Sequence, residues 1–139
     1  MESVSEIKLL FLIGMIFLHI VDDYYLQGWL ASAKQKEWWK QNAPNPLYKY
    51  DYVMALFMHS FSWSFMVMLL PTYYALNSQY AEDIGVVAGQ VIVTFILNLI
   101  THMITDNAKA NQRKINLIQD QTIHMIQIVV TWLYLVVIR

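Results

Sequence analysis

The chain has 139 residues and a mass of 16.3 kDa, enough for one domain and too little for two ordinary ones. Hydrophobic residues make up 58% of the sequence and charged residues 14%, whereas soluble domains carry about 25% charged residues. This composition excludes intrinsic disorder and indicates a membrane protein. The net charge of −1 argues against a nucleic-acid-binding protein, and the absence of cysteine excludes disulfides and thiolate metal sites.

Four stretches free of Lys, Arg, Asp and Glu place the predicted membrane spans, because these residues are costly in hydrocarbon. Three of them reach or nearly reach the roughly 20 residues that a helix needs to cross the bilayer. The first is shorter, but its apolar pattern continues on both sides. The sequence therefore predicts an all-α fold, a single integral membrane domain over residues 1–139 that forms a four-helix bundle. Its spans are expected at about 5–32, 47–75, 83–107 and 117–138, with cytoplasmic loops at 33–46 and 108–116.

Capping signals mark the start of two spans. Asn45 followed by Pro46 supplies a cap and a first-turn proline for the second span. Asn116 followed by Gln119 forms the pattern of a capping box before the fourth. Pro71 lies late in the second span, where it predicts a kink or an early end of the helix.

Basic residues predict the orientation of the spans. Of the nine Lys and Arg residues, seven fall within or beside the loops after the first and third spans. The positive-inside rule places these loops in the cytoplasm and both termini outside it. An interfacial aromatic belt is expected on the cytoplasmic side at Trp38, Trp39, Tyr48, Tyr50 and Tyr52. The seven cations are Lys34, Lys36, Lys40, Lys49, Lys109, Arg113 and Lys114.

All four histidines lie in predicted spans, and three of them have an aspartate four residues away. Residues four apart share a face of a helix, so an imidazole and a carboxylate at this spacing can hold one metal ion. The predicted topology brings all these residues to one layer in the inner half of the bilayer. The predicted metal ligands are His19, Asp23, His59, His102, Asp106, Asp120 and His124.

A metal-free network of hydrogen bonds between helices is the alternative interpretation. Three carboxylates near hydrocarbon with few cations close by favour the metal. Asp22 would face about 100° away from Asp23 and is expected outside the ligand set. Gln27, Asn98 and Gln121 would either orient the ligands or simply join helices.

Four imidazoles and three carboxylates exceed what one four-coordinate ion can use, and they suit two divalent ions with room for water. Nitrogen and oxygen donors without thiolate fit zinc, with manganese and iron as alternatives. Paired ions typically serve the hydrolysis of phosphoesters or amides. In such a reaction Asp120 would ligate a metal or act as the general base.

The combined motifs resemble a family of small bacterial and bacteriophage membrane proteins that has no assigned activity. The resemblance covers about residues 8 to 135 and implies a polytopic protein of the bacterial inner membrane. More remotely, the paired H-x3-D helices are similar to those of inner-membrane metal-dependent hydrolases and zinc-dependent phospholipases C. The chain lacks the N-terminal tryptophan ligand and several further ligands of those enzymes, so this second likeness implies neither a metal number nor a substrate. The motifs are His19-x3-Asp23-x3-Gln27, a lone His59, His102-x3-Asp106 followed by Lys109, and Asp120-Gln121-x2-His124.

Three functions compete on these observations. The first is a metal-dependent hydrolase, a phosphoesterase that acts on a lipid or lipid-linked substrate at the cytoplasmic leaflet, where nearby lysines would hold a phosphate. The second is a non-catalytic bacterial or bacteriophage membrane effector that binds a host membrane partner and contains a structural metal or a polar network. Metal transport is the third, and it is disfavoured because the outer half of the spans holds no histidine or acidic residue. Gly85-x3-Gly89 leaves an oligomer open, since small residues let helices approach closely.

Overall fold

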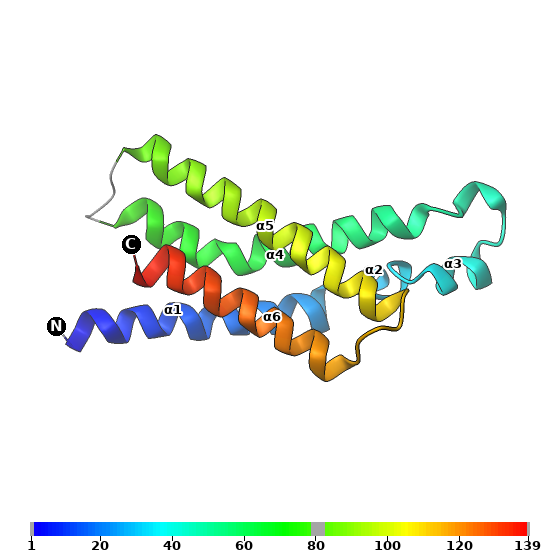
Figure 1. Ribbon diagram of the computed structural model, residues 1–139, viewed down its shortest axis with the longest axis horizontal. Helices are drawn as coiled ribbons and strands as arrows, with labels where there is room; N and C mark the ends of the chain where they lie inside the picture. The colour runs from blue at the N-terminus through cyan, green and yellow to red at the C-terminus, as the bar shows by residue number, and fades with distance from the viewer. Residues whose placement is uncertain (1, 79–82, 139) are drawn as a thin grey trace.

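The computed structural model describes residues 2–78 and 83–138, with side chains from residue 5 onward. All secondary structure in this part of the chain is helical, which confirms the predicted all-α fold. Four long helices run lengthwise through the molecule and are tilted relative to one another (Figure 1). Both chain ends lie at one end of the bundle, and the short helices after the first span lie at the other. The long helices are α1 (Glu2–Val21), α4 (Asp51–Asn77), α5 (Ile84–Ala110) and α6 (Leu117–Trp132).

Short helical segments extend or connect the long ones. A π-helical segment, η1 (Asp22–Leu26), prolongs α1, and another, η3 (Leu133–Val137), prolongs α6. Between the first and second spans lie α2 (Trp29–Ala33), α3 (Lys36–Asn42) and the 3₁₀ turn η2 (Pro46–Tyr48). The segment predicted as the loop 33–46 is therefore largely helical.

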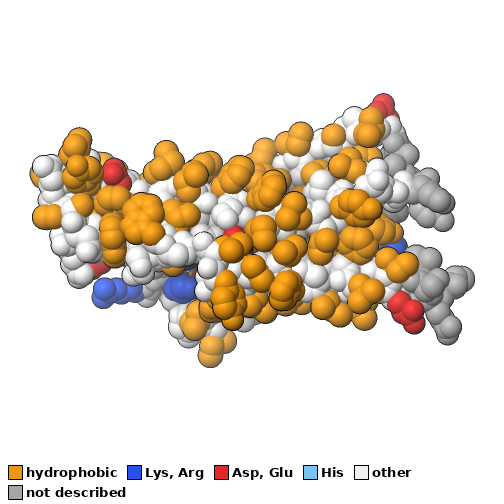
Figure 2. Space-filling model, turned by 180° about the vertical axis from the view of Figure 1, so that it is seen from behind, with side chains coloured by type: hydrophobic (Ala, Val, Ile, Leu, Met, Phe, Trp, Pro, Cys, Tyr) orange, Lys and Arg blue, Asp and Glu red, His pale blue; other side chains and the backbone are white. Residues whose placement is uncertain are grey.

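Four segments of the described chain are long and apolar enough to cross a membrane: Ser5–Leu26, Pro46–Asn77, Ile84–Ala110 and Leu117–Val137. Large apolar side chains cover the outside of the bundle (Figure 2). Leu10, Phe17 and Ile104 are each more than 60% exposed. Such a surface is unfavourable in water and is satisfied by lipid tails, which supports a membrane protein.

The first span differs from the prediction of 5–32. Its helix ends at Leu26, and Gly28 adopts φ 45° and ψ −119° before α2 begins. A left-handed φ at this position is open to glycine and strained for other residues. Because α2 starts after this break, it does not continue the axis of α1.

The other boundaries lie closer to the prediction. The third helix continues to Ala110, so the loop 108–116 begins three residues later than expected. Asn116 and Gln119 form the expected capping box, and Asn45 caps η2, one turn before α4 begins. Helix α4 continues through Pro71 to Asn77, so the proline does not end it.

Helix α4 is the centre of the packing and contacts α1, α2 and α5. Met15, Trp63, Val67 and Ile128 form a fully buried apolar cluster between α1, α4 and α6. This apolar cluster lies beside the buried histidines, because the ring of Trp63 also packs against His102. The core is small, since most apolar side chains point outward, as expected in a bilayer.

Replacing Gly28 with alanine is expected to destabilise the protein by about 1–3 kcal/mol, because the new side chain would hold a strained backbone conformation. Gly89 is the matched control, since it lies inside α5 and a Cβ added there would meet no atom within 4 Å. Thermal unfolding in detergent measures both variants. A Gly28→Ala protein as stable as Gly89→Ala would contradict the assigned backbone conformation.

Candidate metal centre

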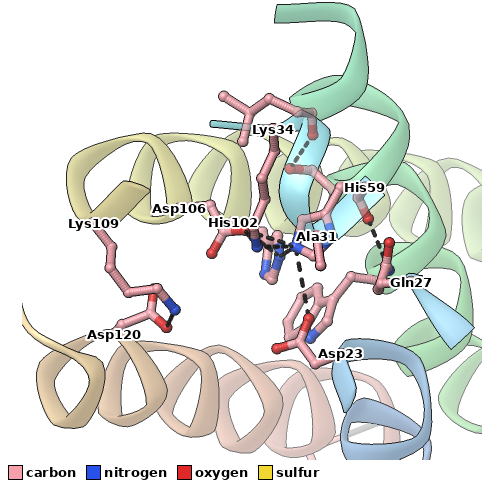
Figure 3. A network of polar contacts seen from close by, with 12 residues as sticks. Asp23, Gln27, Ala31, Lys34, His59, His102, Asp106, Lys109 and Asp120 are labelled. Atoms are coloured by element: carbon pink, nitrogen blue, oxygen red, sulfur yellow. Dashed lines mark hydrogen bonds and ion pairs between the residues drawn. The ribbon is translucent and has the colours of Figure 1, made fainter. Parts of the chain in front are cut away.

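Each of the four long helices contributes one histidine to a single buried cluster. The four imidazole side chains are at most 1% exposed. Asp23 comes from η1 and Asp106 from α5, and both carboxylates point into the same space (Figure 3). We define the His–Asp cluster as His19, Asp23, His59, His102, Asp106 and His124.

Asp106 lies among three of these imidazoles. Its Oδ2 is 2.6 Å from His59 Nε2 and 3.7 Å from His102 Nε2. Its Oδ1 is 3.7 Å from His124 Nε2. The H-x3-D spacing on α5 thus directs both groups to one point, as the helical periodicity predicts.

Asp23 approaches the cluster from the opposite side. Its Oδ2 is 3.6 Å from His19 Nδ1 and 3.9 Å from His124 Nδ1, and its Oδ1 is 3.7 Å from His59 Nε2. The carboxylate therefore connects histidines of α1, α4 and α6, which are far apart in sequence.

Three overlapping groups within the described residues have donor atoms close enough to hold a metal ion, with all donors of a group within 4.8 Å of one another. Two donors of a tetrahedral ion with bonds of about 2.0–2.1 Å lie roughly 3.3 Å apart. The Nε2 atoms of His59 and His102 are 3.3 Å apart, which matches that spacing. The groups are His19–Asp23–His124, Asp23–His59–His102 and His102–Asp106–His124.

Several buried atoms of these groups have no hydrogen-bond partner among the described residues. They include Asp23 Oδ1, His102 Nδ1 and both ring nitrogens of His124. Buried polar atoms without partners are rare in folded proteins, and an ion or ordered water commonly satisfies them. The donor set therefore fits a divalent cation in both its chemistry and its unmet hydrogen-bonding capacity.

Lys34 enters the His–Asp cluster from the end of α2. Its Nζ lies 2.5 Å from Asp106 Oδ2 and 2.8 Å from His59 Nε2 (Figure 3). The side chain is 11% exposed, so this ion pair is largely desolvated. The ammonium group of Lys34 neutralises the Asp106 carboxylate. It contacts Asp106 Oδ2 and His59 Nε2, two atoms that a metal ion would also use as ligands.

The contacts at His59 Nε2 compete with each other. A protonated nitrogen donates to Asp106, while a bare one accepts a hydrogen bond from Lys34. One nitrogen cannot do both. A cation that replaced the ammonium group would resolve this conflict by taking the bare imidazole and the carboxylate as ligands.

His19 differs from the other histidines because both its ring nitrogens are hydrogen bonded. The indole N–H of Trp63 donates to Nδ1 at 2.6 Å, so the imidazole proton lies on Nε2. That nitrogen pairs with Gln121 Oε1 at 3.1 Å, and Gln121 Nε2 donates to Asp120 Oδ2 at 3.1 Å. This directed chain orients His19 and links three helices.

Trp63 also forms a wall of the cluster. Its ring stacks on His102 with centroids 4.2 Å apart, and His102 stacks on His124 at the same distance. The sequence analysis did not single out Trp63, although it lies four residues after His59 on α4 and this spacing could have identified it.

Asp120 was predicted as a metal ligand or general base, and the structure places it at the edge of the cluster. It belongs to none of the three groups among the described residues. Lys109 Nζ lies 2.5 Å from its Oδ2, and its Oδ1 is 4.0 Å from His124 Nε2. Oδ1 has no hydrogen-bond partner in the described part of the chain. This geometry favours a role beside the metal site over direct ligation.

Asp22 lies outside the His–Asp cluster, as expected from its 100° offset. It is fully buried against α4, where Ser62 Oγ donates to its Oδ1 at 2.7 Å. Gln27 donates to its other oxygen and also to the backbone carbonyl of His59 at 3.4 Å. These bonds fix η1 against α4 and so set the position of Asp23.

The three polar residues predicted to orient ligands differ in their place. Gln121 contacts His19 directly. Asn98 lies one turn from His102 on α5 and donates to Thr131 Oγ1 at 2.8 Å, where it joins α5 to α6. Gln27 joins η1 to α4 and bonds Asp22.

The cluster lies within the segments that can span a membrane and collects four imidazoles and two carboxylates, with Asp120 beside it. Comparison of the chain with protein-family models, curated proteins and solved structures finds no match. The site therefore rests on the chain's own residues: buried His and Asp groups that could hold a metal ion inside a bundle of apolar helices.

Proposed function

We propose that the protein is a membrane-embedded metal-dependent hydrolase, a phosphoesterase that acts on a lipid or lipid-linked substrate at the cytoplasmic leaflet. The observation that carries the proposal is the meeting of four histidines and two aspartates from four helices within apolar, lipid-facing segments. Burying carboxylates at this depth is costly unless a cation compensates them. A site of this composition is a functional candidate for that reason.

Roles follow from the contacts. Asp23, His59, His102, Asp106 and His124 would hold one or two divalent ions, zinc before manganese or iron. The bound metal would supply Lewis-acid stabilisation of a phosphoryl oxygen. Asp120 would act as the general base and accept a proton from the attacking water at Oδ1, while Lys109 pairs with its other oxygen. His19 would be held in place by Trp63 and Gln121 and would close the site beside Asp23.

The test is hydrolysis by purified protein in mixed micelles that contain lipid phosphates or a lipid pyrophosphate. Phosphate release is expected with added zinc or manganese and is expected to stop with a chelator. Asp120→Asn is expected to reduce the rate by about 10²–10⁴-fold, because it removes the proton acceptor and keeps the side-chain shape. Metal-loaded protein that cleaves none of these lipids would contradict the proposed activity.

A second candidate is a non-catalytic membrane effector whose cluster is a polar network. The observation that favours it is the pairing of both Lys34 and Lys109 with carboxylates, which neutralises Asp106 and Asp120 without a metal. This candidate predicts purified protein that is free of metal and remains folded in chelator. Metal content therefore separates the two functions before any substrate is known.

The proposed orientation puts α3 in the cytoplasm and the end of α4 outside it. Because the chain has no cysteine, single cysteines at Gln41 and Asn77 report each side separately. In intact spheroplasts a membrane-impermeant maleimide is expected to label Asn77→Cys. Gln41→Cys is expected to react only after lysis. The reverse pattern would contradict the orientation from basic residues.

A further inference from the structure

A cavity of about 500 Å³ lies outside the His–Asp cluster, at the connection between the first and second spans. It is an open pocket bounded by α3, η2 and the turn between them. Three lysines and two aromatic rings line it: Lys36, Lys40, Lys49, Trp39 and Tyr48. None of the cluster residues lines this cavity.

Two of the three lysines have no carboxylate partner among the described residues. Lys40 pairs with Glu37 at 2.8 Å, and this hydrogen bond lowers the pKa of the Glu37 carboxyl. Neither Lys36 nor Lys49 has an acidic group within 4.0 Å in the described part of the chain. Lys36 Nζ lies 6.0 Å from the ring centroid of Tyr52, and Lys49 Nζ lies 5.2 Å from that of Tyr50. The cavity therefore carries positive charge that an anion would neutralise.

An apolar groove of about 420 Å³ lies on the other side of Trp39. Trp39 lines both spaces, so its ring is their common wall. The groove follows the first turns of α4, where Met54 and Met58 are four residues apart, and Asp51 lies at its start. Its apolar wall is Trp29, Leu30, Trp39, Met54, Ala55 and Met58.

Trp39, which lines both spaces, is fixed by a hydrogen bond and by three aromatic neighbours. Its indole N–H donates to the carbonyl of Ala33 at 2.6 Å, and its ring stacks on Tyr48 at 6.5 Å. Trp29 and Trp38 meet the same ring edge-on at 6.0 and 5.1 Å. A cationic cavity and an apolar groove are thus fixed side by side at the end of the bundle. Figure 2 shows most of the visible Lys and Arg side chains at this end.

We propose that this pair of spaces binds an anionic phospholipid, with the phosphate between Lys36 and Lys49 and an acyl chain along Met54 and Met58. The site lies where a membrane span meets a segment rich in tryptophan and lysine. Membrane proteins commonly place these residue types at the level of the lipid headgroups. Charge selects an anionic headgroup, and the groove selects a molecule that also carries a hydrocarbon chain. This lipid site is separate from the proposed hydrolytic centre.

The test is native mass spectrometry, with tryptophan fluorescence, of the full chain in detergent titrated with three probes. These are dioctanoyl phosphatidylglycerol, dioctanoyl phosphatidylcholine and inorganic phosphate. Phosphatidylglycerol is expected to bind at least about tenfold more tightly than either of the others. Equal binding of the two lipids would overturn the charge selection, and phosphate binding as tight as the anionic lipid would overturn the role of the groove.

Matched variants locate the site. Lys36→Gln with Lys49→Gln is expected to weaken phosphatidylglycerol binding by about 30-fold, since each lysine near the surface contributes about fivefold. The control, Lys8→Gln with Lys114→Gln, removes two charges that do not line the cavity and is expected to leave binding unchanged. Met58→Trp fills the groove and is expected to weaken both lipids. Equal losses in the two double variants would show that only overall charge acts and would overturn the proposal.

Discussion

Protein in which both His102 and His124 are replaced by alanine is expected to purify with less than about a tenth of the wild-type content of divalent metal. Each of these histidines belongs to two of the three candidate groups. Without both, no group keeps more than two donors, whereas zinc sites in proteins use at least three protein ligands. Elemental analysis of protein purified without a metal-affinity tag, followed by calorimetric zinc titration, measures the loss.

The matched control is Asn98→Ala, which removes a buried polar side chain one helical turn from His102. It breaks the bond from Asn98 to Thr131 and is expected to keep wild-type metal content. His102→Gln separates metal loss from misfolding. Glutamine keeps a polar side chain in the cluster, so this variant is expected to fold and to bind less metal. Equal metal in wild type and in the double histidine variant would remove the basis for a metal site at this cluster.

The second large effect is expected at Lys34. Lys34→Met leaves Asp106 without its ammonium partner, and breaking a buried ion pair on one side costs about 3–5 kcal/mol. The metal-free variant should therefore unfold well below the wild type in a thermal scan. Added zinc should restore the stability of the variant, because the ion takes the place of the ammonium group beside Asp106. Zinc should also bind about tenfold more tightly to Lys34→Met than to wild type, because no lysine competes with it.

Lys40→Met is the matched control for this variant. Its pair with Glu37 is exposed on both sides, and surface pairs contribute about 0–1 kcal/mol. Similar unfolding of the two metal-free variants would show that Lys34 does not stabilise the cluster. Equal stabilisation of wild type and Lys34→Met by zinc would show that lysine and metal do not compete.

Apolar stretches without charged residues were sufficient to predict the four spans, and helical periodicity predicted most of the cluster. The i, i+4 pairs on α1, α5 and α6 are local, and the alternation of helix direction brings them to one depth without knowledge of the packing. His59 had no such partner and was placed by topology alone. The structure brings six of these seven residues together in the His–Asp cluster and places Asp120 at its edge.

Lys34 could not be predicted in the cluster because no spacing rule links it to the histidines. Its position depends on the break at Gly28, which ends the first helix earlier than the apolar pattern indicates and redirects the chain. The sequence left open whether Asp120 ligates a metal or acts as the general base, and the structure places it at the edge of the cluster. Asp120 pairs with Lys109, which lies one turn beyond Asp106 on α5. Whether a carboxylate pairs with a lysine or faces a metal site depends on how the helices pack, which the sequence does not show.

The hydrogen-bond chain from Trp63 through His19 and Gln121 to Asp120 has a consequence for biogenesis. Its last two members lie on α6, which is synthesised after α1, α4 and α5. Until that helix is inserted, His19 has no acceptor for its Nε2 proton, and Lys109 has no carboxylate to neutralise it. Insertion of α6 therefore supplies, from one helix, the partners of polar groups on α1 and α5.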